Sequence, residues 1–294
     1  MLTAMSNTAL ISGAIAAGYW FLRAQTIHKG FGLTVHWWSL VDLLAGLLIS
    51  TLAMFGIFLV EWLIGGIRVE AVQLNLAVLG DQWRLEAALA LFEEFVSRAC
   101  QLPGLQITLA LLLALVLRGR LGGSWESRTD KTLGWCAWPA ILIIAAVFGY
   151  VHISNPNATP VSAFGNALGG LMYGIAFIGG RNLWMPVGMH FGWNFVQGPV
   201  LGFPVSGTLK PSLITLQETG SDLLTGGAFG PEAGLIGMFF RFVIIAMVLG
   251  YLYLRAGRRG NVARLEFPIA VYDNPPGSRR PLFGRRNTVA PRTV

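Results

Sequence analysis

The sequence predicts an all-α fold, a polytopic transmembrane bundle of about eight helices. Three observations predict it: 54% of the 294 residues are hydrophobic, only 12% are charged, and the mean hydropathy is +0.61. A water-soluble domain carries about 25% charged residues and cannot bury this much apolar surface. The composition therefore excludes a water-soluble enzyme, a disordered chain and an ordinary nucleic-acid binder. Long apolar runs that leave water must satisfy their backbone internally, as helices do.

Each predicted helix is an apolar stretch near the length of about 20 residues that a span requires. Eight stretches qualify: 4–22, 40–65, 83–100, 103–118, 136–153, 162–179, 184–203 and 233–254. The first lacks a charged n-region, so we expect a retained helix rather than a cleaved signal. The second and the last are the strongest, whereas the fourth is short and could be re-entrant. The glycine-rich sixth stretch permits close helix contacts.

Loop charges support this count and set the orientation. With eight spans, the basic groups at 68–84, 118–131 and 181 and those of the C-terminal tail all fall on one side of the membrane. That side is predicted to be cytoplasmic by the positive-inside rule. We therefore expect an integral, multi-pass protein, of a bacterial inner membrane, with both termini in the cytoplasm.

The chain divides into a transmembrane helical domain, 1–254, and a basic tail, 255–294. The tail holds nine arginines against Glu266 and Asp273, which accounts for the whole net charge of +7. We expect it to be largely disordered and to anchor on anionic lipid. Because it has no aromatic interleaving, no nucleic-acid partner is predicted. The two cysteines, Cys100 and Cys136, show no metal or redox spacing and are interpreted as packing residues.

Ionisable groups inside apolar helices mark candidate sites, because each is costly unless it is paired. Glu94 and Arg98 share a helix face at i,i+4 and can neutralise each other, while Glu93 points about 100° away. His152 ends another apolar helix, one turn after Phe148. On a third helix His190 and Asn194 again share a face at i,i+4. The candidate site residues on these three helices are Glu93, Glu94, Arg98, Phe148, His152, His190 and Asn194.

Other polar residues have simpler interpretations. Asp42 and Glu61 lie near the two ends of the second span and are predicted to be interfacial. Arg241 is expected to snorkel or to pair with a neighbouring carboxylate. Each histidine, and the Glu–Arg pair, could by itself have a purely structural role. However, these polar residues occur together in three apolar spans, and this coincidence favours a functional site.

Two kinds of chemistry fit these side chains. A buried carboxylate beside a histidine can take a proton from water and return it to a leaving amine, while a second histidine and an amide stabilise an oxyanion. Alternatively, Glu93, His152 and His190 could bind Zn²⁺ with an open water position. No HExxH helix is present, so no cofactor is favoured, although zinc stays open.

The three motifs also carry a resemblance. EExxxR at 93–98, FxxxH at 148–152 and HxxxN at 190–194 resemble the CAAX-protease and bacteriocin-processing (CPBP, abortive-infection) family of intramembrane endopeptidases. The similarity covers roughly 83–203, is reinforced at 226–237, and implies a protease-like core of about 83–254.

The resemblance implies roles for these residues. Glu93 would activate the water, assisted by His152, and His190 and Asn194 would stabilise the oxyanion. Glu94 and Arg98 would support the helix that presents Glu93. The implied activity is hydrolysis of peptide bonds in membrane-associated proteins or peptides, and the implied partners are that substrate and the bilayer. We favour the metal-free version, because asparagine is a poor zinc ligand.

Two functions of other classes stay open. The first is a non-catalytic membrane scaffold or immunity protein with the same fold, which would keep its cellular phenotype without Glu93. The second is a proton-coupled transporter, since intramembrane glutamate and histidine also build proton relays. The sequence shows no inverted repeat, which disfavours the transporter.

Overall fold

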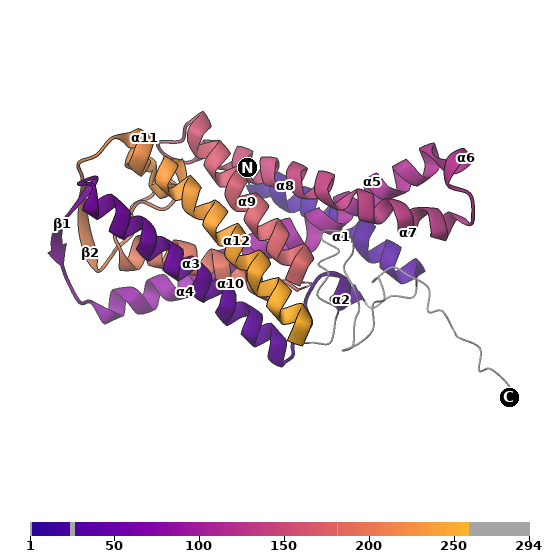
Figure 1. Cartoon of the computed structure of the whole chain (residues 1–294), viewed down its shortest axis with the longest axis horizontal. Coiled ribbons are helices and arrows are strands. Elements are labelled where there is room, and N and C mark those ends of the chain that lie inside the picture. The colour runs from indigo at the N-terminus through magenta and orange to yellow at the C-terminus, as the bar shows by residue number, and fades with distance from the viewer. Residues whose placement is uncertain (1, 24–26, 181, 259–294) are drawn as a thin grey trace.

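The computed structural model describes residues 2–23, 27–180 and 182–258 of the chain. Helices dominate this part of the chain, and the elements follow in this order: α1 (Leu2–Leu22), α2 (Ile27–Gly30), α3 (Trp37–Leu63), β1 (Ile67–Val72), α4 (Leu76–Glu94), η1 (Phe95–Gln101), α5 (Leu102–Val116), α6 (Arg118–Leu121), α7 (Trp125–Trp135), α8 (Ala137–Val151), η2 (His152–Ser154), α9 (Pro160–Gly180), α10 (Trp184–Phe195), η3 (Val196–Val200), β2 (Ile214–Glu218), α11 (Asp222–Thr225), η4 (Gly227–Phe229), η5 (Pro231–Ala233) and α12 (Leu235–Arg258). β1 and β2 pair antiparallel at one end of the bundle (Figure 1). The predicted all-α helical bundle is confirmed. Most of the predicted tail, 259–294, lies outside the described residues.

The predicted number of about eight spans is wrong. By length and composition, five helical segments of the described chain could cross a membrane: Trp37–Leu63, Leu76–Val116, Ala137–Ser154, Pro160–Gly180 and Leu235–Arg255. The stretches 83–100 and 103–118 are parts of one of these segments, because the π-helical η1 continues α4 into α5 without a break.

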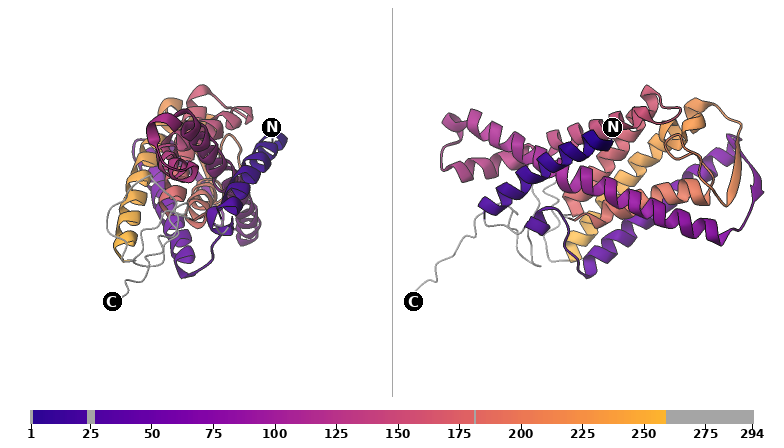
Figure 2. Two further views of the ribbon diagram at one scale, coloured as in Figure 1. Left: turned by 90° about the vertical axis from the view of Figure 1, so that its right-hand side faces the viewer. Right: turned by 180° about the vertical axis from the view of Figure 1, so that it is seen from behind.

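Two further predicted spans fall short for different reasons. Within 184–203, the helix α10 is only 12 residues long and then passes into a π-helical turn that contains Pro199. The stretch 4–22 does form a helix, α1, but Asn7 and its polar neighbours lower the hydropathy of that helix. α1 packs instead against η1 and α5, across the outside of the bundle (Figure 2).

Close backbone contact holds α10 against α3. A Cβ on Gly46 of α3 would collide with the carbonyl oxygen of Met185, and a Cβ on Gly188 of α10 would collide with the carbonyl oxygen of Leu43. Small residues allow such close approach of helices in membranes, where packing rather than hydrophobicity drives association. The contact therefore sets the position of the helix that carries two of the predicted site residues.

A buried polar network fastens the start of α10. Asp42, which the sequence analysis placed near the membrane interface, is fully buried within the protein. It accepts hydrogen bonds from Arg255 Nη2 at 2.6 Å, from the Tyr251 hydroxyl at 2.7 Å and from Asn182 Nδ2. Asn182 Oδ1 in turn accepts from the backbone N–H of Trp184 at 3.0 Å. The network thus joins α3, α12 and the first turn of α10.

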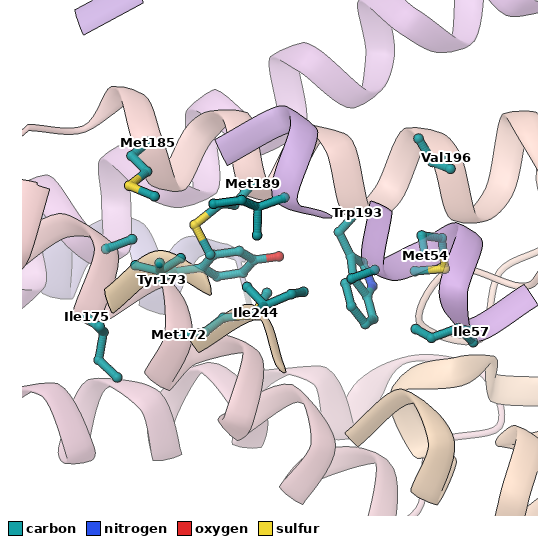
Figure 3. Close-up of a cluster of buried hydrophobic side chains, with 14 of the residues drawn as sticks. Met54, Ile57, Met172, Tyr173, Ile175, Met185, Met189, Trp193, Val196 and Ile244 are labelled. Carbon is teal, nitrogen blue, oxygen red and sulfur yellow. The ribbon is translucent and has the colours of Figure 1, made fainter. Parts of the chain in front are cut away.

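The largest apolar cluster lies among α3, α9, α10 and α12. Figure 3 shows Met189 and Trp193 of α10 facing Met172 and Tyr173 of α9, with the Tyr173 hydroxyl on the side of Trp193. Met54 of α3 completes this face. Close packing of such side chains gives α9 and α10 a defined relative position.

Candidate active site

A cavity of about 160 Å³ lies beside this apolar cluster. Its walls come from α4, α8, η2, α9, α10, the loop before β2, η5 and α12. The four residues predicted to be catalytic all line it: Glu93, His152, His190 and Asn194. A polar cavity of this size has room for several water molecules. The fold therefore brings together side chains that are up to about a hundred residues apart in sequence.

The two adjacent glutamates of α4 have different environments. Glu94 is fully buried, and its Oε1 accepts hydrogen bonds from Arg98 Nη1 at 3.2 Å and from His190 Nδ1 at 2.8 Å. The Glu93 side chain is 28% exposed, lines the cavity, and makes no hydrogen bond within the described part of the chain. One carboxylate is thus neutralised inside the bundle, while its neighbour is directed to the cavity.

Arg98 lies in the π-helical turn η1, which directly follows Glu94. Its side chain is fully buried, and its Nη2 donates to the carbonyl oxygen of Gly170 on α9 at 3.3 Å. The guanidinium also stacks over the rings of Phe148 at 4.5 Å and Tyr173 at 5.1 Å. Arg98 therefore joins α4, α8 and α9, and Phe148 is part of its surroundings. π-Helical turns of this kind frequently occur at functional sites.

His190 is held in one orientation. A carboxylate can only accept, so the 2.8 Å contact assigns a proton to Nδ1, which donates to Glu94. The imidazole also stacks on Tyr173, with ring centroids 4.9 Å apart and an angle of 14° between planes. Its other nitrogen, Nε2, lies 4.0 Å from Glu93 Oε2. That separation is too long for a hydrogen bond and suits one bridging water.

His152 lies at the end of α8, where its ring faces Phe148 with centroids 4.7 Å apart. Its Nδ1 is 2.6 Å from the carbonyl oxygen of Phe148, which can only accept, so Nδ1 is the protonated nitrogen. The remaining nitrogen, Nε2, is then free to accept a hydrogen bond in the neutral ring. The structure gives His152 no direct hydrogen bond to Glu93 among the described residues; the two share the cavity.

Asn194 donates from Nδ2 to Oε2 of Glu86 at 3.4 Å. Sequence reasoning missed Glu86, which is fully buried on α4 and lies 3.1 Å from Lys210 Nζ through its other oxygen. The missed signal was the spacing: Glu86 and Glu93 are seven residues apart, which places both on the same face of α4. Lys210 gave no signal, because nothing in the polar stretch 204–232 shows that it reaches α4.

One of the comparisons with known proteins found a match. Residues 84–196 match the family model of the type II CAAX prenyl endopeptidase, Rce1-like. The predicted resemblance to the CAAX-protease family is confirmed. The matched segment covers less than half of the chain and contains all three motifs. Comparison with curated proteins and with solved structures gave no match. An Rce1-like segment among membrane-length helices indicates an integral membrane protein and supports a CAAX-type protease.

Residues beyond the Rce1-like segment complete the cavity. Glu232 of η5 accepts hydrogen bonds from Gln197 Nε2 at 2.7 Å and from the Ser206 backbone N–H at 3.1 Å. Burial raises the pKa of the Glu232 carboxyl, although the guanidinium of Arg241 and these hydrogen bonds oppose the change. Arg241, which sequence reasoning expected to snorkel or pair, is buried, stacks over Trp193 at 4.8 Å and donates to the carbonyl of Gly165.

The three zinc ligands considered from sequence, Glu93, His152 and His190, are not arranged as a metal site in this structure. Within the described ranges, no three His, Cys, Asp or Glu side chains are arranged to hold a metal. Of the three ligands considered from sequence, His190 uses Nδ1 for Glu94, and its Nε2 is 4.0 Å from Glu93. Two ligand atoms that each lie about 2.0–2.1 Å from one tetrahedral zinc ion are about 3.3 Å apart, so Glu93 and His190 would have to move closer together to share an ion. We therefore derive no step through a metal.

Proposed function

We propose that this protein is an intramembrane endopeptidase that hydrolyses peptide bonds of membrane-associated proteins or peptides with a glutamate-activated water. The observation that carries the proposal is the contrast between the two glutamates. Arg98 and His190 hold Glu94 inside the bundle, which leaves Glu93 directed into a cavity that His152, His190 and Asn194 also line. The family match supports the same activity through its description as a prenyl endopeptidase.

In the proposed reaction, water occupies the space between Glu93 Oε2 and His190 Nε2. Glu93 takes one proton from this water while Nε2 of His152 accepts its second hydrogen bond. The resulting hydroxide attacks the carbonyl carbon of the scissile peptide bond, and the carbonyl oxygen becomes an oxyanion. Glu93 then transfers its proton to the amide nitrogen as the carbon–nitrogen bond breaks. The products are a new carboxylate and a new amine.

His190 and Asn194 are proposed to stabilise the oxyanion. The carboxylates of Glu93 and Glu94 on either side of the imidazole favour its charged form, in which Nε2–H is a donor. Asn194 Nδ2 carries two protons, of which one binds Glu86 and the other is available to the oxyanion. Loss of one such donor typically costs about 10²–10³ in kcat.

Placement in a bacterial inner membrane, with the hairpin between α5 and α7 in the cytoplasm, is also part of the proposal. Five crossings would put the two termini on opposite sides of the membrane, so the expectation of two cytoplasmic termini is not kept. The exposed basic residues of the hairpin between α5 and α7, Arg118, Arg120 and Lys131, support the cytoplasmic position of that end. Fusion of a reporter at this hairpin tests the orientation.

The experiment that tests the activity uses the purified protein in liposomes with a library of membrane-tethered peptides. Mass spectrometry identifies the new termini produced by the wild type, by His152→Ala and by His190→Ala. We expect discrete cleavage by the wild type and at least a 10²-fold slower reaction with each variant. Equal cleavage by all three proteins would refute the proposed function.

A further inference from the structure

Glu86 is a buried acid that the proposed hydrolysis does not use. It lies two turns before Glu93 on the same face of α4, and its side chain is 1% exposed. Both of its oxygens have a neighbour: Oε1 lies 3.1 Å from Lys210 Nζ, and Oε2 accepts from Asn194 Nδ2 at 3.4 Å. A buried carboxylate is stabilised by a nearby cation and by hydrogen-bond donors.

Lys210 is built into the structure rather than being a mobile surface lysine. Its side chain is only 17% exposed, and its stem lies over Gly198 of η3, where an added Cβ would come within 3.1 Å of Lys210 Cγ. It follows the bridge between Val205 and Thr208, in the loop that covers the cavity. The missing side chain at position 198 thus leaves the path by which the ammonium reaches α4.

The charge of Glu86 decides which end of the Asn194 amide faces the cavity. An ionised carboxylate only accepts, so it requires Nδ2 of Asn194 and leaves the second Nδ2–H for the cavity. A protonated carboxyl can donate to Oδ1 instead, which would rotate the amide and direct its carbonyl oxygen differently. An oxygen acceptor near an oxyanion would repel it. Lys210, as the cationic partner 3.1 Å from the Glu86 carboxylate, would therefore favour the orientation that keeps a donor available at the reacting carbonyl.

We propose that Lys210 and Glu86 are positioning residues that set the orientation of the Asn194 amide toward the oxyanion. The inference rests on the proposed function. It assigns a catalytic consequence to the loop before β2, which lies outside the matched family segment. It also predicts that the effect of either residue passes through Asn194.

The test compares kcat and KM for a membrane-tethered peptide. Glu86→Gln and Lys210→Met should each lower kcat about 10-fold or more, which is part of the roughly 10²–10³ that complete loss of an oxyanion donor costs. KM should change less than about twofold, because the donor acts on the transition state. Lys210→Arg keeps the charge and should retain most of kcat. In an Asn194→Ala background, Glu86→Gln should lower kcat no further.

Asp81→Asn is the matched control, since Asp81 belongs to an exposed ion pair with Arg84 on the same helix, 3.6 Å apart. It should leave kcat and the melting temperature unchanged. If Glu86→Gln lowers kcat by the same factor with and without Asn194, or leaves kcat unchanged, the inference is overturned. If the wild type cleaves nothing, the proposed function fails separately. In that case the melting temperatures of the same variants in detergent test the contact between Glu86 and Asn194. Shifts for Glu86→Gln and Asn194→Ala that do not add in the double variant support this contact, and additive shifts overturn it.

Discussion

Replacing Arg98 by methionine should destabilise the protein strongly, because three buried interactions depend on one guanidinium. The change removes the 3.2 Å ion pair with Glu94 and the 3.3 Å hydrogen bond to Gly170. It also removes the stacking over Phe148 and Tyr173. Both side chains of the ion pair are fully buried, and breaking such a pair by removing one partner costs about 3–5 kcal/mol. Each ring contact adds roughly 0.5–2 kcal/mol. Methionine retains part of the packing, so we expect a net loss of about 4 kcal/mol.

The assay is denaturant-induced unfolding of the purified protein in detergent micelles, with the free energy of unfolding taken by linear extrapolation. The double variant Glu94→Gln/Arg98→Met removes both charges and should recover at least half of the loss, because no buried carboxylate is then left with the His190 hydrogen bond as its one remaining partner among those described. Arg84→Met is the matched control, since Arg84 is 78% exposed in its ion pair, and its effect should stay within about 0.5 kcal/mol. A loss below about 1 kcal/mol for Arg98→Met, or a double variant no more stable than the single one, would refute the reasoning.

Three further predictions concern packing, pH and metal. Gly188→Ala should separate α10 from α3 at Leu43 and should lower both the melting temperature and kcat. The control is Gly250→Ala, whose added Cβ meets nothing within 4 Å and should be neutral or slightly stabilising. Differential scanning fluorimetry measures both melting temperatures. Burial raises the pKa of the Glu232 carboxyl from its ordinary 4.5, so the folded protein binds this proton more tightly than the unfolded chain does. The protonated Glu232 therefore contributes fully to stability below pH 4.5, and this contribution is lost as the pH rises through the raised pKa. Glu232→Gln should flatten this decline in thermal unfolding measured across pH, and an unchanged slope would contradict the assignment. Dialysis against a chelator should leave peptide cleavage intact, with zinc well below one ion per chain by elemental analysis; loss of activity that only added zinc restores would contradict the metal-free proposal.

Contacts within one helix could be anticipated from the sequence. Four-residue spacing already places Glu94 beside Arg98, and the structure shows that contact at 3.2 Å. The apolar composition likewise predicted a helical membrane bundle. The number of spans could not be read in the same way, because hydropathy does not reveal that η1 continues α4 into α5.

Contacts between distant segments could not be predicted from the sequence. That His190 would bind Glu94 rather than Glu93 depends on how α10 crosses α4, which the close contact of α10 with α3 determines. Asp42 and Glu61 lie near the ends of a span, and the sequence did not show that both would be fully buried within the protein. The partners of Asp42 come from α12 and from Asn182, about 140 residues or more further along the chain. Local spacing carries no information about such partners.

The most direct measurement of the central claim is kcat of Glu93→Gln for a membrane-tethered peptide in liposomes, with Glu70→Gln as control. Glutamine preserves the size of the side chain but cannot take the proton of the attacking water. Glu70 lies exposed on β1, away from the cavity, so its substitution should leave kcat unchanged. We expect Glu93→Gln to lower kcat by about 10²–10⁴ while its melting temperature stays close to that of the wild type. A Glu93→Gln protein that cleaves the peptide at the wild-type rate would contradict the account.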